Sequence, residues 1–251
     1  MRDPGVAGLS LIGREIERSA HHDFLLYAVT SDIRQSWLGL TPTLARMISA
    51  FEGIVDRFIV ASSEFGRKLA KVRPDQWTSP TPCTEWDVRQ LVNHMTRGNF
   101  NYAGLMDGAA SSEFLRLRDA DALGTDPVAS YARSVRECAE AFARPGALQR
   151  ILDYPLGRVT GQQALAVRTS DSIIHTWDLA RAIGADDTLN VGLVAWISDH
   201  LNNIYSGLSQ TPPSAGTSNR FFAPPTGMLP DGAAQQDRLL HTMGRRLDHA
   251  S

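Results

Sequence analysis

The chain has 251 residues, of which 43% are hydrophobic and 21% are charged. These proportions are ordinary for a globular protein with a substantial core, in one large domain or two small ones. The formal net charge of −2 gives no electrostatic reason to expect a nucleic acid or an anionic membrane as a partner. No apolar run reaches the roughly 18–20 residues that a membrane span needs.

The N-terminal stretch and the cysteines indicate the compartment. The stretch has only a short apolar patch, interrupted by Arg14, Glu15 and Glu17, and so lacks the long apolar region of a secretory signal. The two cysteines, Cys83 and Cys138, are too few for a disulfide framework. We therefore expect a cytoplasmic protein.

Apolar residues recur at helical spacing along most of the chain. Pro74 ends the first clear helix, because the residue before proline avoids the helical region. Asp126 followed by Pro127 is typical of a helix start, and Thr160 with Gln163 forms a capping box. The predicted helices are 43–72, 84–105, 126–143, 160–184, 190–208 and a short one at 233–244.

Little of the sequence alternates as a strand does. Residues 147–159 contain Pro155 and Gly157 and are interpreted as an irregular crossover. The predicted fold is therefore all-α, a helical bundle of four or five long helices with long crossovers at residues 43–208. Residues 1–42 form an N-terminal extension, interpreted as an arm over the core, a partner contact or a tail. Residues 209–251 form a C-terminal tail that wraps the surface and ends in the short helix.

The stretch LAVRTSDSIIHTWDLARA, at 165–182, carries ionisable groups on one side of its helix. Each helical residue turns by about 100°, so Asp171 lies roughly 40° from His175 and Arg168 about 20° from it. Apolar residues flank this stripe, which therefore faces the protein interior. The opposite side is expected to face water, and it carries Gln162, Thr169, Ser170 and Arg181.

Buried charges are costly unless they are paired or bind a metal. Asp171 and His175 are one turn apart, the spacing at which one helix offers two ligands to a metal ion. His94, mid-helix at 84–105, is the best candidate for a third ligand. Asp/His pairs at this spacing also arise as caps or hydrogen-bonded core pairs, and a single inward histidine is commonly a core residue. On spacing alone, both interpretations stay open.

Neighbouring polar groups allow two roles each. Arg168 is expected either to bind a substrate carboxylate with its two-pronged guanidinium or to form an ion pair with Asp171. Asp178 is expected to orient His175, the alternative being an ion pair with Arg181. Asn101 is expected to line the pocket beside His94. Cys83 is interpreted as a small buried residue at a helix start rather than a reactive thiolate.

Two separated motifs carry a resemblance to a known family. PTPCTEWDVRQLVNHM at 80–95 and IIHTWDLARAIG at 173–184, with the ending FFAPP…QQDRLLHTMGR, resemble the mycothiol-dependent maleylpyruvate isomerase family of the DinB-like metalloproteins. The resemblance covers roughly Met47 to Arg245. It implies a DinB-like four-helix bundle that holds one divalent metal ion, often zinc. Carried onto this sequence, the implied ligands are His94, Asp171 and His175.

The sequence departs from the family pattern in two ways. Members with isomerase activity carry glutamate where this chain has Asp171, and the 42-residue N-terminal segment lies outside the usual family length. Both differences favour a specialised activity.

The resemblance implies an enzyme that uses a divalent metal, with zinc expected, and mycothiol or another low-molecular-weight thiol. A divalent ion lowers the pKa of a bound thiol, and the thiolate attacks a small electrophilic metabolite, giving isomerisation or S-transfer. One alternative is the same metal bundle without a thiol, acting as a lyase, cyclase or hydrolase in secondary metabolism. Another is a non-catalytic metal-binding or ligand-binding module. The expected partner is a small-molecule substrate, and the protein is expected to be a monomer or a homodimer.

Overall fold

The computed structural model describes residues 50–84, 86–208 and 228–247. The predicted N-terminal extension at 1–42 and most of the predicted wrapping tail lie outside the described residues. From Gly53 on, the described residues form one compact unit. The predicted division of the chain at residues 43 and 209 stays a prediction.

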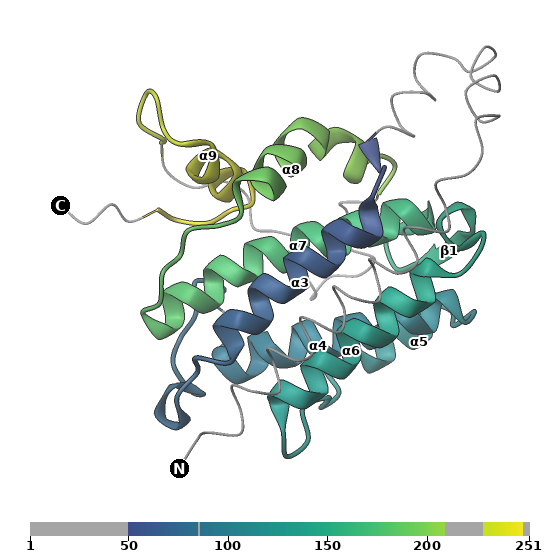
Figure 1. Ribbon diagram of the computed structural model, residues 1–251, viewed down its shortest axis with the longest axis horizontal. Helices are drawn as coiled ribbons and strands as arrows, with labels where there is room; N and C mark the ends of the chain where they lie inside the picture. Colours follow the sequence, from purple (N-terminus) through teal and green to yellow (C-terminus); the bar gives the residue numbers. More distant parts are fainter. Residues whose placement is uncertain (1–49, 85, 209–227, 248–251) are drawn as a thin grey trace, which may run out of the picture. The chain divides into compact units, whose positions relative to one another are not determined.

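Four long helices form the core of this unit, which confirms the all-α, DinB-like prediction. Helix α7 packs against α3 and α4, and α6 packs against the same two helices (Figure 1). The short helices α8 and α9 pack against each other, and α8 also packs on α7. The bounds are α3 Ile54–Leu69, α4 Val88–Met106, α5 Ser111–Leu117, α6 Pro127–Ala143, α7 Gly161–Ile183, α8 Val191–Ile204 and α9 Gln235–Thr242.

Several helix boundaries follow from local hydrogen bonds that the sequence predicts. The Asp126 carboxylate accepts from the amide of Ala129, with Pro127 in the first turn. The Thr160 hydroxyl caps α7 in the same way, and Gly184 ends α7 with a φ of 66°. These helix ends are confirmed. The capping box predicted for Thr160 and Gln163 is only half formed, because the Gln163 side chain donates to the backbone oxygens of Ile204 and Ser206.

One predicted helix is interrupted and one predicted helix start is wrong. The start predicted at residue 43 lies outside the described residues. Within the helix predicted at 43–72, Ala50 is helical, Gly53 adopts a left-handed φ of 64°, and α3 begins at Ile54. The α4 cap is Asp87, whose carboxylate accepts from the Gln90 amide at 2.8 Å, and not Thr84. The Gln90 side chain accepts in return from the Asp87 amide, so the capping box lies one turn later than predicted.

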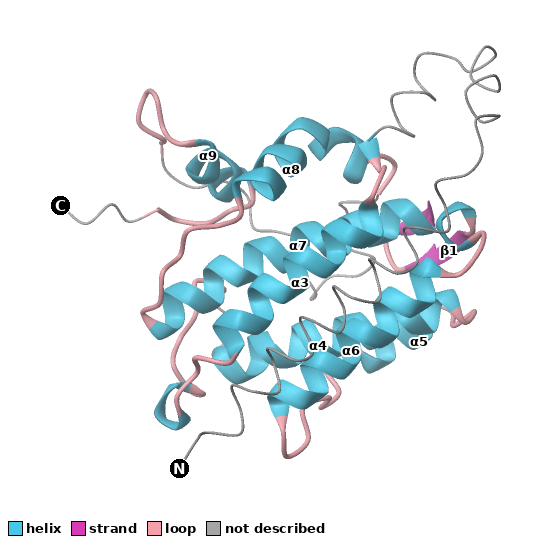
Figure 2. Cartoon of the chain, in the orientation of Figure 1, coloured by secondary structure: helices cyan, strands magenta, loops and turns pink. Residues whose placement is uncertain are grey.

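The crossover predicted at 147–159 contains a hairpin. Strands β1 (Ile151–Tyr154) and β2 (Gly157–Thr160) pair antiparallel, with Leu152 opposite Val159 (Figure 2). Leu152 and Val159 are both buried, so a short alternation was present in the sequence. The proline and glycine read as breakers belong to the turn and to the strand start after it.

Helix α7 has no water-facing side along most of its length, which corrects the prediction for Thr169 and Ser170. Both residues are fully buried. Their hydroxyls donate to the carbonyl oxygens of Leu165 and Ala166, four residues earlier. A short hydroxyl side chain can therefore satisfy itself within its own helix, and α7 lies at the centre of the bundle.

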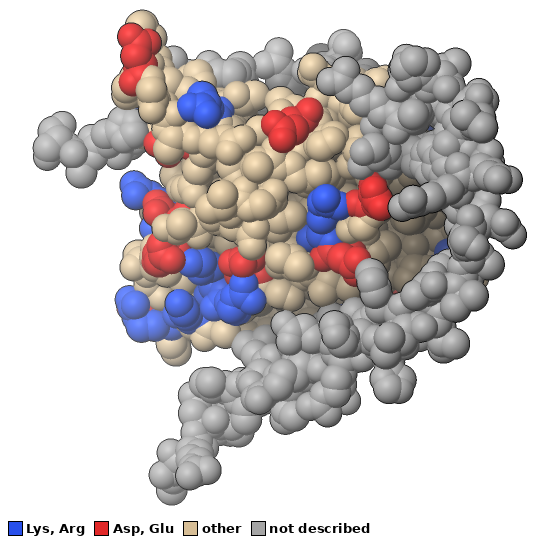
Figure 3. All heavy atoms as spheres, turned by 45° about the horizontal axis from the view of Figure 1, so that its top comes forward, with Lys and Arg blue, Asp and Glu red and all other residues tan. Residues whose placement is uncertain are grey.

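On the face drawn in Figure 3, basic side chains gather at the lower left beside acidic ones, and broad areas carry no charge. This mixture agrees with the small net charge. None of the described helices is both long and apolar enough to cross a membrane.

Candidate metal centre

Helices α4 and α7 bring His94, Asp171 and His175 together. The Asp171 carboxylate lies between the two rings, with Oδ2 at 3.2 Å from His94 Nε2 and Oδ1 at 3.1 Å from His175 Nε2. The ligand atoms of all three residues lie within 4.8 Å of one another. Residues separated by 77 positions thus converge on one point of the bundle core.

The donor set fits a divalent metal. Zinc bonds imidazole nitrogen and carboxylate oxygen at about 2.0–2.2 Å, so neighbouring donors of a tetrahedral site lie about 3.4 Å apart. The two Asp171 separations are close to that value. The side chains are 27% (His94), 19% (Asp171) and 5% (His175) exposed, which leaves the cluster reachable on the His94 side. Two imidazoles and a carboxylate can therefore hold zinc and leave a position for a small ligand.

Arg168 lies behind the cluster and is 1% exposed. Its guanidinium donates to Asp171 Oδ2 at 2.5 Å, to the Asn99 side-chain oxygen at 2.8 Å and to the backbone oxygen of Met95. Of the two roles expected for Arg168, the structure therefore shows the ion pair with Asp171. All three donor nitrogens have protein acceptors, and a role in substrate binding stays a prediction.

Gly98 on α4 provides the space for this guanidinium. A Cβ atom at residue 98 would lie 2.7–2.9 Å from three guanidinium atoms of Arg168. The glycine, which costs helix stability, is thus explained by the buried arginine.

Asp178 orients the second histidine. Its Oδ2 lies 2.8 Å from His175 Nδ1, so Nδ1 donates and Nε2 is directed at Asp171. The alternative partner of Asp178 is not used, because Arg181 pairs with Asp187 at 3.4 Å. A carboxylate behind a histidine is the usual arrangement at protein metal sites.

The charges of the cluster set its protonation. Burial raises the pKa of Asp171, but His175 and His94 hold it well below its usual range. Burial lowers the pKa of His175, but Asp171 and Asp178 raise it well above the usual value. Burial dominates at His94 and lowers its pKa. In the metal-free protein these interactions favour the protonated form of His175 and the neutral form of His94.

Trp86 covers both histidine rings. Its ring centroid lies 4.5 Å from that of His94 and 5.7 Å from that of His175. An indole ring packed against two imidazoles limits the access of water to them. Sequence analysis had no signal for this contact.

Asn101 is not part of the cluster. It is buried, and its amide donates to the backbone oxygen of Phe114 in α5 at 3.3 Å. The expectation that it lines the pocket stays a prediction that these contacts do not support.

Cys83 and Arg245 complete the surroundings of His175, and sequence analysis assigned a role here to neither. Cys83 Sγ lies 3.8 Å from His175 Nδ1 and donates to Asp178 Oδ2 at 3.3 Å. Arg245 Nη2 donates to Cys83 Sγ at 3.2 Å. The only sequence signal was that both residues lie within the stretches that carry the family resemblance.

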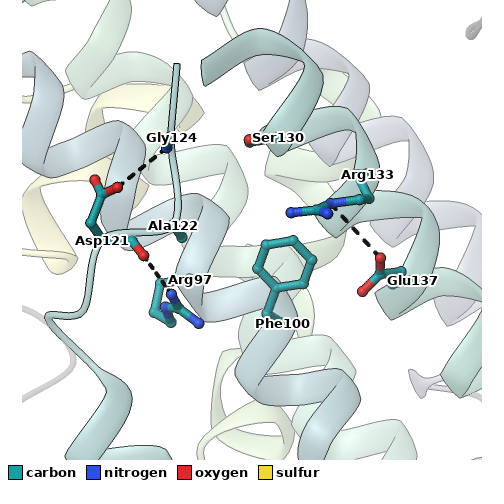
Figure 4. A pocket seen from close by; sticks show the side chains of 8 residues that line it. All are labelled: Arg97, Phe100, Asp121, Ala122, Gly124, Ser130, Arg133 and Glu137. Atoms are coloured by element: carbon teal, nitrogen blue, oxygen red, sulfur yellow. Dashed lines mark hydrogen bonds and ion pairs between the residues drawn. The ribbon is translucent and has the colours of Figure 1, made fainter. Parts of the chain in front are cut away.

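A separate open pocket of about 450 Å³ lies on the α4–α6 side (Figure 4). Arg97 and Arg133 flank the Phe100 ring, and Asp121 and Glu137 lie beside them. Two positive and two negative groups balance, so the pocket selects no ligand by charge. None of the residues of the metal-ligand cluster lines it.

The two cysteines are expected to differ sharply in reactivity. Cys138 is fully buried, and burial raises the pKa of its thiol to about 12, whereas Cys83 is half-buried. A chromogenic disulfide reagent should therefore label one thiol in the native protein and two after unfolding. Cys83→Ser should abolish the native reaction. Two thiols reacting in the folded protein would contradict this packing of Cys138.

Comparisons with known proteins identify the family of the chain. The uncharacterized proteins Rv0738 and MT0763 of Mycobacterium tuberculosis, from strains H37Rv and CDC 1551 / Oshkosh, are each 35% identical to the chain over 130 residues, which cover 52% of this chain and 67% of each relative. Residues 59–180 match the family described as the mycothiol maleylpyruvate isomerase N-terminal domain. The chain belongs to this family.

The span matched by the maleylpyruvate isomerase family contains His94, Asp171 and His175 but not Arg245. Among solved structures, a mutant of the mycothiol-dependent maleylpyruvate isomerase aligns with a TM-score of 0.48 and 16% identity. The alignment covers 61% of this chain and 69% of that one.

Proposed function

We propose that this protein is a metal-dependent enzyme that uses a low-molecular-weight thiol, of the mycothiol type, either to isomerise a small electrophilic metabolite or to transfer the thiol to it as an S-transferase. The observation that carries the proposal is the convergence of His94, Asp171 and His175 within 4.8 Å in a chain of the maleylpyruvate isomerase family. Two imidazoles with one carboxylate suit a catalytic divalent ion, for which zinc is the first candidate.

Zinc bound here would supply Lewis acidity, which lowers the pKa of a coordinated thiol so that it is nucleophilic at neutral pH. Other residues of the chain hold the proposed ligands in place. Asp178 fixes the ring of His175, and Arg168 holds the carboxylate of Asp171. Trp86 excludes water above the histidines, which strengthens the electrostatic interactions below it.

Neither cysteine of the chain is needed as the nucleophile. Cys138 is buried in the core, and Cys83 is engaged with Asp178 and Arg245 on the Nδ1 side of His175, away from the ligand atoms Nε2. The nucleophile is therefore expected to come from a cosubstrate. The family match, rather than the cysteines, favours thiol use over the same bundle working without a thiol.

Thermal shift of the zinc-loaded protein tests thiol use. At a thiol concentration of 100 Kd, a thiol that binds only the folded form stabilises it by about 2.7 kcal/mol. For a chain of this size that raises Tm by roughly 5–10 °C. Mycothiol should give a rise that grows with concentration, and its S-methyl derivative, which cannot form a thiolate, should give little.

The comparison of variants separates the alternatives. His175→Ala should lose the thiol-dependent shift, and Arg181→Gln, exposed on the same helix, should keep it. A zinc-loaded protein with a flat response to mycothiol, glutathione and cysteine would support the thiol-free lyase, cyclase or hydrolase. A protein that binds no metal would leave the non-catalytic module. Maleylpyruvate is the first substrate to assay, because the matched family is named for its isomerisation.

A further inference from the structure

Arg245 reaches the Nδ1 side of His175 from the far end of the chain. Helix α9 ends at Thr242, and Gly244 turns the backbone with a φ of 75°. The amide of Gly244 donates to the oxygen of His241, and the amide of Arg245 donates to that of Leu240, both at 2.9 Å. This is a Schellman motif, and it aims the arginine back into the bundle.

The guanidinium binds both oxygens of the Asp178 carboxylate. Arg245 Nε donates to Oδ1 at 3.0 Å and Nη2 donates to Oδ2 at 2.5 Å. Nη1 donates to the backbone oxygen of Met243, so the fork is held from its own segment as well. Asp178 is fully buried, and a two-pronged pair of this kind fixes the plane of its carboxylate.

The plane of the Asp178 carboxylate sets the orientation of the His175 ring. Oδ2 accepts from His175 Nδ1, and that bond directs Nε2 toward Asp171 and His94. The chain of contacts runs from α9 through Arg245 and Asp178 to the proposed ligand atom.

We propose that Arg245 is a positioning residue of the metal centre, and that metal binding and the docking of α9 stabilise each other. The inference rests on the proposed metal site of the preceding subsection. Because such coupling is reciprocal, a docked Arg245 raises metal affinity and a bound metal protects α9 by the same factor. The C-terminal helix is then a structural part of the metal centre.

The zinc affinity of the Arg245→Gln variant tests whether Arg245 positions the metal ligands. Affinity is measured by competition with a chromogenic chelator on folded, metal-free protein. Arg245→Gln should weaken zinc binding by about 10–100-fold, the usual cost of losing an outer partner of a ligand. Arg246→Gln, an exposed neighbour, should change affinity less than twofold. Arg245→Lys, which keeps the charge without the fork, should fall between them.

Further variants test the chain of contacts from α9 through Arg245 and Asp178 to His175. Gly244→Ala should weaken zinc binding in the same direction, because alanine does not tolerate the positive φ that aims Arg245. Asp178→Asn should weaken it as well, and the double variant Asp178→Asn/Arg245→Gln should lose no more than Asp178→Asn alone. Additive losses would overturn the path through Asp178.

Hydrogen exchange provides a second readout, which follows α9 directly. In the wild-type protein, zinc should slow the exchange of the α9 and Gly244–Arg245 amides, and this protection should vanish in Arg245→Gln. If the wild-type protein binds no stoichiometric zinc, the proposed function falls and the inference falls with it. If it binds zinc, but Arg245→Gln binds within twofold of the wild type and α9 exchange is unchanged, only the inference is overturned.

Discussion

Replacing Arg168 with methionine is expected to lower the free energy of unfolding of the metal-free protein by about 3–5 kcal/mol. Arg168 is 1% exposed and pairs with Asp171 while also satisfying Asn99 and the Met95 carbonyl. Its removal leaves a largely buried carboxylate without its arginine and two buried acceptors without their donor. Chemical denaturation followed by circular dichroism measures the change.

Arg181→Met is the matched control, because Arg181 lies on the same helix. Its side chain is 48% exposed and its ion pair with Asp187 is long, at 3.4 Å. An exposed pair of this kind contributes less than about 1 kcal/mol. A loss of under 1 kcal/mol for Arg168→Met as well would show that the buried pair is not structural.

Gly98→Ala makes this prediction more specific. In the wild type, the new methyl group would lie within 2.9 Å of three guanidinium atoms, so the substitution should destabilise despite the better helix propensity of alanine. In the Arg168→Met background the guanidinium is gone. There, Gly98→Ala should stabilise by up to about 1 kcal/mol. The reversal of sign in a double-mutant cycle tests the contact itself.

Removing either histidine is expected to lower zinc affinity by on the order of 10²–10³-fold. Total zinc-binding energies of about 10–16 kcal/mol, shared among four ligands, correspond to roughly 3–4 kcal/mol for each. His94→Ala and His175→Ala should both purify without stoichiometric metal, as measured by elemental analysis. Asp171→Asn should fall in the same range, because it removes the one anionic ligand.

His200→Ala is the control for the metal prediction. His200 lies on α8, where its Nδ1 contacts the backbone oxygen of Trp196, and it is not part of the cluster of His94, Asp171 and His175. The zinc content of the His200→Ala variant should equal that of the wild type. Because the ligands bind metal only when deprotonated, wild-type affinity should also rise as the pH rises through the raised pKa of His175. Full zinc occupancy in both histidine variants would exclude the proposed centre.

Much of the secondary structure could be predicted from the sequence because its signals are local. The Asp126-Pro127 start of α6 and the Thr160 and Gly184 ends of α7 depend on hydrogen bonds and backbone angles within a few residues. The spacing of Asp171 and His175 likewise fixed that both lie on one face of α7, whatever packs against it. The mid-helix position of His94 made it the best candidate for a third ligand, and the family motifs implied the same residue.

The sequence by itself therefore determined the helices and the candidate ligands. Only the tertiary structure decided that Thr169 and Ser170 are buried, that Arg168 is an internal ion-pair partner, and that Arg245 meets Cys83 across 162 positions. The physical reason is the separation along the sequence of the residues that interact. Helix ends are set by bonds between near neighbours, whereas the burial and partner of a charge depend on which distant segment packs against it.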